Sequence, residues 1–265
     1  MIQVLVEHED TPDYMRLFAS VAVLMMTALI LLVSTVKEKK LAKIIAKEYP
    51  DYQVEENEQT HEQLGPEGRK SLTLALMALF FYYMAYNGIT TAFSRYAQEV
   101  WGLTGGGFAV ALMVVAVSAF ASYIPLGALA SKIGRKKVIA SGFWMMLVTF
   151  VVMSFISVYH WYINLWFIIV GVGGSAVGVN IFPVIVDMCS HSELGKYTGL
   201  YYTFSMAAQI ITPIASGFLL DHISYRTLFP YAAMFTALGI LVLRNVHHGD
   251  CVPEQTGNLL GYLDN

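Results

Sequence analysis

Long uncharged stretches constrain this chain more than any other feature of its sequence. Residues Gly107–Ala130 and Val138–Tyr159 contain no charged side chain, and only seven residues separate them. A helix needs about 20 apolar residues to cross the hydrocarbon core of a bilayer. Two such helices joined by so short a connection must be antiparallel neighbours. The composition agrees, because 13% of the residues are charged, against about 25% in a soluble domain.

Seven such segments predict an all-α integral membrane protein with seven transmembrane helices. They are Met15–Val36, Ser71–Phe93, Gly107–Ala130, Val138–Tyr159, Tyr162–Val186, Tyr197–Leu220 and Leu228–Val246. We expect the first to be an anchor helix and the other six to form one bundle, residues 71–246. Within residues 37–70, Lys37–Tyr49 predicts an amphipathic helix on the membrane surface, and the acidic stretch after it predicts a linker. Residues 1–14 and 247–265 are expected to be an outer and a cytoplasmic tail.

The positions of the cations predict the orientation of these spans. Seven spans place thirteen lysines and arginines on one side of the membrane and three on the other. The three are Arg16, Arg95 and Arg226. Cytoplasmic loops of membrane proteins carry an excess of lysine and arginine. The N-terminus is therefore expected outside and the C-terminus in the cytoplasm, with the chain in the plasma membrane.

The six-helix segment contains a weak internal repeat. The stretch Gly127–Ile133 aligns with Gly217–Ile223, 90 residues later, and each copy follows the second helix of a helix triplet. Because three is an odd number, the two triplets must cross the membrane in opposite directions. Inverted three-helix repeats are a building plan of secondary transporters. The sequence therefore predicts a bundle made of two inverted three-helix repeats.

The turn between the third and fourth spans resembles a family signature. Its sequence, Gly127-Ala-Leu-Ala-Ser-Lys-Ile-Gly-Arg-Lys-Lys137, is similar to the Gly-x-Leu-Ala-Asp-Arg-x-Gly-Arg-Lys pattern of the major facilitator superfamily of secondary transporters. The chain resembles the second half of such a carrier, from helix six to helix twelve. Ser131 stands where the family usually has aspartate, which weakens the expected helix-end salt bridge. The resemblance implies a gating motif, consisting of Gly127, Ser131, Gly134, Arg135, Lys136, Asp221 and Arg226.

The second span further resembles bacterial sugar–cation symporters of the sucrose and glycoside type. The resemblance rests on Tyr86-Asn87-Gly88, followed by Thr90, Thr91, Phe93 and Arg95-Tyr96. It implies transport of a small neutral polar solute, favouring a sugar, by alternating access as part of a symporter. A proton or sodium ion would be the coupling ion, and no cofactor is expected. Since a full carrier has twelve helices, the resemblance also implies a missing N-terminal half or a second chain. A truncated, non-transporting remnant or a scaffold subunit is the alternative.

Neutral polar residues within the spans are the candidates for solute contact. They are Tyr83, Tyr86, Asn87, Thr91, Asn180 and Gln209. Amides bond sugar hydroxyls, and aromatic faces cover the apolar surface of a sugar ring. Hydrogen bonding between neighbouring helices is the alternative role for each. The glycines of the fifth span, Gly171, Gly173, Gly174 and Gly178, predict close helix packing.

Other classes of function find little support in the sequence. Neither His-Glu-x-x-His nor Gly-x-Ser-x-Gly occurs, so an enzyme is not expected. Cys189 and Cys251 are far apart, and no metal site or nucleic-acid partner is predicted. Arg95 and Glu99, four residues apart, predict a surface ion pair within one helix.

Single cysteines in the two repeat turns test the predicted orientation. With Cys189 and Cys251 replaced by serine, Lys132→Cys should react with an impermeant maleimide only after permeabilisation of the cells. Asp221→Cys should react in intact cells, because an odd number of spans separates the turns. Labelling of both cysteines from the same side would contradict the inverted repeat.

Overall fold

The computed structural model describes residues 14–35, 65–104, 106–188 and 193–246, and it divides into two compact units, Met1–Thr60 and His61–Asn265. The regular elements of the described ranges are all helices. In the first unit, α2 (Tyr14–Thr35) lies within one residue of the predicted first span at each end. The predicted amphipathic helix at residues 37–49 lies outside the described residues.

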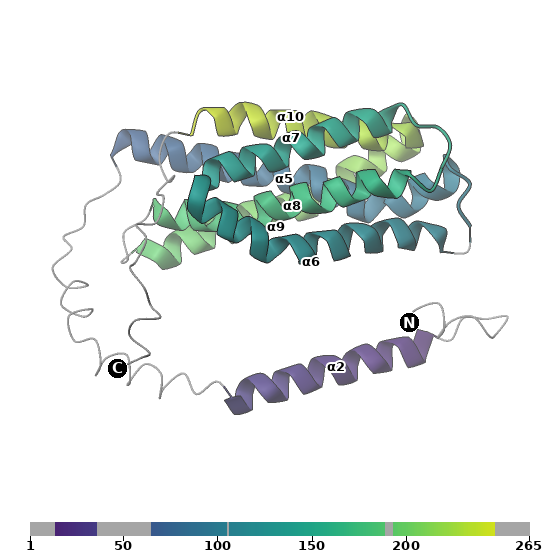
Figure 1. Ribbon diagram of the computed structural model, residues 1–265, viewed down its shortest axis with the longest axis horizontal. Coiled ribbons are helices and arrows are strands. Elements are labelled where there is room, and N and C mark those ends of the chain that lie inside the picture. The colour runs from purple at the N-terminus through teal and green to yellow at the C-terminus, as the bar shows by residue number, and fades with distance from the viewer. Residues whose placement is uncertain (1–13, 36–64, 105, 189–192, 247–265) are drawn as a thin grey trace. The chain divides into compact units, whose positions relative to one another are not determined.

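Six long helices form the second unit. They are α5 (Pro66–Glu99), α6 (Gly107–Ile133), α7 (Arg135–Ser154), α8 (Ile163–Asp187), α9 (Leu194–His222) and α10 (Leu228–Arg244), with the short 3-10 helix η2 (Tyr225–Thr227) before the last (Figure 1). By length and apolar composition, all six are able to span a membrane, with η2 extending α10. The integral membrane helical bundle predicted from the sequence is thus confirmed. Helix α5 differs most from expectation, because it begins at Pro66, not at Ser71. Proline suits the first turn of a helix, where no backbone donor is needed.

The packing of the six helices has an internal symmetry. Helix α5 packs mainly on α9 and α10, and α8 packs mainly on α6 and α7. The remaining large contact joins α7 to α10. Exchanging the triplet α5–α6–α7 for the triplet α8–α9–α10 leaves this set of contacts unchanged. It is the packing expected of two inverted three-helix repeats.

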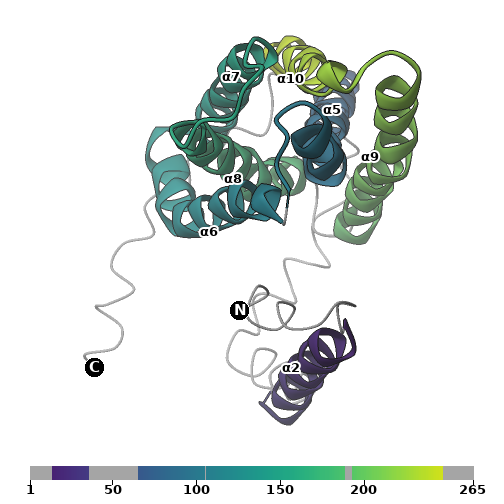
Figure 2. The same ribbon diagram turned by 90° about the vertical axis from the view of Figure 1, so that its right-hand side faces the viewer.

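The six helices differ in how much of each is buried in the bundle. Viewed end on, α7 and α10 lie together on one side, and α5 and α8 occupy the middle, flanked by α9 and α6 (Figure 2). Among the six helices, α6 and α9 are the least buried. The symmetry therefore leaves the second helix of each triplet exposed at a flank of the bundle.

Glycines set the closest helix approaches in this bundle. A β-carbon added at Gly142 of α7 would lie 2.5 Å from the carbonyl oxygen of Gly173 on α8. On the neighbouring contact, one added at Gly239 of α10 would lie 2.5 Å from a ring carbon of Phe143. Real β-carbons almost never come so near. Close approach at small residues replaces the hydrophobic driving force that helices lack in lipid. The packing role predicted for Gly173 is thereby confirmed.

Substitution of Gly142 should disturb the bundle as a whole. We expect Gly142→Ala to lower stability by about 1–3 kcal/mol, because the added methyl must separate α7 from α8. The change is measured as the unfolding temperature of the purified chain in detergent. Gly199→Ala is the matched control, since nothing lies within 4 Å of a β-carbon there. Equal unfolding temperatures for the two variants would show that this contact does not hold the helices together.

Candidate functional site

Helix α5 carries a group of four polar residues near its middle. Tyr82, Tyr83, Tyr86 and Asn87 follow at helical spacing, so their side chains share one face. The Tyr82 hydroxyl donates to the carbonyl oxygen of Gly174 on α8 at 3.0 Å, and the Tyr82 ring stacks on Tyr86. The hydroxyls of Tyr83 and of Tyr201 on α9 lie 3.3 Å apart. This face of α5 is thus tied to α8 on one flank and to α9 on the other.

A cavity of about 320 Å³ opens beside these four residues. Ala119 and Tyr123 of α6 and Gly174, Ser175, Gly178 and Val179 of α8 complete its wall. None of these lining residues carries a charge. A β-carbon at Gly174 would lie 3.1 Å from the Tyr86 ring, so glycine gives that ring its room. The result is a neutral, aromatic, hydroxyl-rich cavity between three helices, which we call the tyrosine cavity.

The side-chain amide of Asn87 lies in the wall of this cavity. Its nitrogen is buried and has no hydrogen-bond partner among the described residues. A buried polar group without a partner costs about 1–3 kcal/mol, and such groups in native proteins call for an explanation. A solute hydroxyl in the cavity would accept this hydrogen bond. Binding would then recover an interaction that the protein alone forgoes.

The structure brings together three of the six predicted solute contacts. Tyr83, Tyr86 and Asn87 line the same cavity. Thr91 is exposed and donates to the carbonyl oxygen of Asn87 at 2.6 Å. Asn180 is buried and donates to the carbonyl oxygen of Ala176 on its own helix at 2.9 Å.

Gln209 is exposed on α9 and is not among the residues that line the cavity. Sequence reasoning did not single out Tyr82, Tyr123 and Ser175, which do line it. Tyr82 offered a signal, since it precedes Tyr83 and shares the face of Tyr86. Tyr123 and Ser175 offered none, because only packing brings α6 and α8 beside α5.

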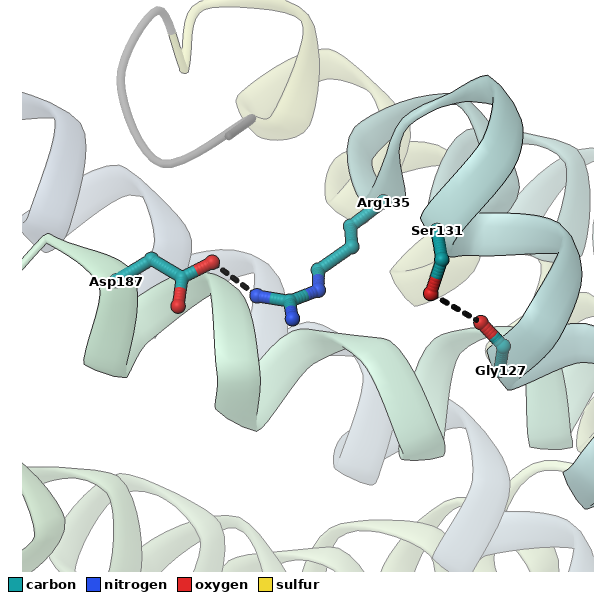
Figure 3. Close-up of polar contacts among 4 residues, drawn as sticks. All are labelled: Gly127, Ser131, Arg135 and Asp187. Atoms are coloured by element: carbon teal, nitrogen blue, oxygen red, sulfur yellow. Dashed lines mark hydrogen bonds and ion pairs between the residues drawn. The ribbon is translucent and has the colours of Figure 1, made fainter. Parts of the chain in front are cut away.

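The basic turn lies at the C-terminal end of α6, where Gly134 separates this helix from α7. Gly134, with φ +98°, forms the turn between α6 and α7. The Ser131 hydroxyl donates back to the carbonyl oxygen of Gly127 at 3.2 Å, so it takes no part in a helix-end salt bridge (Figure 3). Arg135 instead forms an ion pair with Asp187 at the end of α8, and the two side chains are 20% and 27% exposed. Asp187 is therefore a motif partner that sequence reasoning missed.

A second ion pair occupies the other end of the bundle. Arg95 of α5 pairs with Asp221 of α9 at 3.7 Å, and both side chains are well exposed. The predicted pair of Arg95 with Glu99 is wrong, because α9 brings a carboxylate from the second repeat to Arg95. In each pair, one residue lies where the second helix of a triplet meets the third, namely Arg135 or Asp221. The other residue lies near the end of the first helix of the other triplet. The two pairs therefore occupy equivalent positions in the inverted repeat. The first helix of the triplet carries the arginine in one pair and the aspartate in the other.

A metal centre is not evident in the part of the chain that the structure describes. No group of three histidine, cysteine, aspartate or glutamate side chains there is close enough to hold an ion. Six membrane-spanning helices, three of which line an uncharged cavity, have the architecture of a helical membrane transporter.

The comparisons with known proteins identify the family. A model of the Major Facilitator Superfamily matches residues 75–250. The chain belongs to this superfamily of transporters. No curated protein matches the sequence.

Solved structures of a peptide transporter have a similar fold. A crystal structure of the peptide transporter POT in complex with sulfate is similar with a TM-score of 0.60 at 18% identity, covering 74% of this chain and 42% of that chain. A mutant of POT in complex with alafosfalin gives a TM-score of 0.61 at 18% identity, covering 70% and 41%. The chain thus spans about two fifths of the length of these structures. At such low identity the likeness shows the fold alone.

The ion pair of Arg135 with Asp187 should contribute measurably to stability. A double-mutant cycle with Arg135→Gln and Asp187→Asn should give a coupling free energy of about 1 kcal/mol, because the two side chains are largely shielded from water. The measurement is unfolding of the purified chain by sodium dodecyl sulfate. The pair of Glu193 with Lys196, at 2.9 Å, is the matched control.

That control pair is local in sequence, three residues apart, and its cation is more exposed than Arg135. Hydrogen bonds from Lys196 and Tyr197 hold the pKa of Glu193 below its ordinary value, yet the lysine is 63% exposed. We expect its coupling to stay below about 0.5 kcal/mol, as for exposed ion pairs in general. If both cycles gave the same coupling, Arg135 and Asp187 would not act as a structural link.

Proposed function

We propose that this chain forms the C-terminal half of a secondary transporter that moves a neutral sugar across the plasma membrane. The observation that carries the proposal is the uncharged cavity among α5, α6 and α8, with the unpartnered amide of Asn87 in its wall. Its volume of about 320 Å³ falls at the lower end of the range for small-molecule sites, about 300–1,000 Å³. Alternating access would expose this cavity to each side of the membrane in turn.

The chemistry of the cavity favours a neutral polyhydroxyl compound over a charged one. Tyrosine rings cover the C–H surface of a sugar, and hydroxyls and amides exchange hydrogen bonds with its hydroxyl groups. A zwitterionic peptide would bring two charges into a site whose described lining offers none. Placing an unpaired charge in such surroundings is strongly unfavourable. The peptide transporters of the same fold therefore serve as a guide to architecture, not to substrate.

The proposed half needs a second half-domain to complete its pathway. Large apolar side chains are exposed along α6 and α9, among them Phe120, Ile124, Ile210 and Ile214. Helix α6 forms part of the wall of the tyrosine cavity, and Tyr201 of α9 lies against Tyr83 in that wall. A second half-domain packed against both flanks would cover the cavity and leave it accessible only at the two ends. The described lining contains no carboxylate, so a residue of that partner would carry the coupling proton or bind the coupling sodium ion.

Reconstitution tests the substrate and the half-carrier together. The chain is co-expressed with one that supplies the five preceding helices, and uptake of labelled monosaccharides, disaccharides and dipeptides into vesicles is measured. We expect uptake of a sugar but not of a dipeptide, and none with either chain alone. Asn87→Ala should lower sugar uptake about tenfold or more, since it removes the hydrogen bond that the cavity reserves for solute.

Asn245→Ala is the matched control, because that amide lies at the end of α10 and donates to the carbonyl oxygen of Leu241. Its uptake should equal that of the unmodified chain. Equal uptake by the two asparagine variants would remove Asn87 from the site. A complex that assembles but moves no solute would point to a scaffold role, and dipeptide uptake would overturn the choice of substrate.

A further inference from the structure

A second cavity, larger than the tyrosine cavity, lies between α7 and α10. It has a volume of about 510 Å³. On α7 it follows Lys136, Ala140, Trp144 and Leu147, which recur every three or four residues and so form one stripe along the helix. Helices α7 and α10 supply no residue to the lining of the tyrosine cavity. The proposed solute pathway therefore gives this cavity no role.

The middle of the cavity is an apolar groove. Ala140 on α7 and Ala237 on α10 are small, and they leave room between the helices. Trp144 and Leu241 form its rims and are 55% and 60% exposed. The stripe from Lys136 to Leu147 covers twelve residues, and the eleven steps between them span about 16 Å of helix at 1.5 Å per residue. One leaflet of a bilayer has a hydrocarbon thickness of about 15 Å, half of the whole core.

Two cations stand at one end of this groove. Lys136 is at the start of α7 and Arg244 is at the end of α10, so antiparallel packing brings both to the same end of the bundle. The Lys136 ammonium donates to the carbonyl oxygen of Val246. No carboxylate is among the residues that line the cavity. The groove is thus apolar along its length, and the residues that line one mouth include two cations.

We propose that this groove binds an anionic phospholipid from the leaflet at the basic end. The phosphate lies between Lys136 and Arg244, and one acyl chain follows Ala140 and Trp144 toward the membrane centre. Charge complementarity selects this occupant, because a transmembrane helix of another protein would cover the groove without using two cations at one end. Basic pockets between membrane helices are a known mode of lipid headgroup recognition. The bound lipid would bridge the third helices of the two repeats.

The fluorescence of Trp144 reports on the groove directly. The purified full chain is placed in nanodiscs of phosphatidylcholine with rising fractions of phosphatidylglycerol brominated near the middle of its acyl chains. The chain has four tryptophans, so the signal of Trp144 is the difference between the unmodified chain and Trp144→Phe. We expect saturable quenching at a low fraction of the anionic lipid, and much weaker quenching by brominated phosphatidylcholine.

Neutralising Lys136 or Arg244 should weaken the preference for the anionic lipid, and neutralising both should weaken it further. Each cation contributes roughly fivefold near a membrane surface, so Lys136→Gln or Arg244→Gln should raise the half-saturating fraction about fivefold. The double change should raise it roughly 25-fold, and Lys136→Arg should restore it. Lys137→Gln is the matched control, because it removes the same charge from the same turn but not from the groove.

Three results would overturn the proposal. One is equal quenching by the two brominated lipids, and another is the absence of quenching, which would mean that protein and not lipid covers Trp144. The third is an equal loss of preference in Lys137→Gln, which would assign the effect to general surface charge. Circular dichroism and gel filtration of each variant separate a lost site from a lost fold. Arg244→Gln changes an exposed side chain and serves if Lys136→Gln does not fold.

Discussion

The close contact of α7 with α8 at Gly142 and Gly173 is the constraint on which the rest of the bundle depends. It joins the last helix of one repeat to the first helix of the other, where no β-carbon fits. Because α8 is held there, its small residues also meet α6 and its Gly174 accepts the hydroxyl of Tyr82. The tyrosine cavity therefore exists only as long as the helices on its far side pack closely.

The sequence predicted the helices well and the contacts between them poorly. Uncharged length alone located every span, because a backbone in lipid must satisfy its own hydrogen bonds. Asn180 shows the limit of such reasoning. Its depth in a span favoured a solute contact, yet its amide donates to the carbonyl oxygen of Ala176. Asp187 forms an interaction that the sequence did not predict. Its partner Arg135 lies 52 residues earlier and reaches it only because α7 packs on α8.

The predicted candidates that gather at the cavity all come from one helix. Tyr83, Tyr86 and Asn87 share a face of α5, and helical spacing is readable in a sequence. Tyr123 and Ser175 enter the wall from α6 and α8, and their inclusion depends on helix crossings that no local pattern encodes. A single helix of a polar site can thus be found from its periodicity, whereas the site as a whole requires the tertiary fold.

The two ion pairs clarify what the basic turn does within this chain. Arg135 with Asp187 and Arg95 with Asp221 both join one repeat to the other inside the same half-domain. These pairs therefore link the two repeats at opposite ends of the same six-helix unit. Shielding makes Coulomb attraction stronger, so the less exposed pair at Arg135 fixes its end of the unit more firmly than the exposed pair at Arg95 fixes the other.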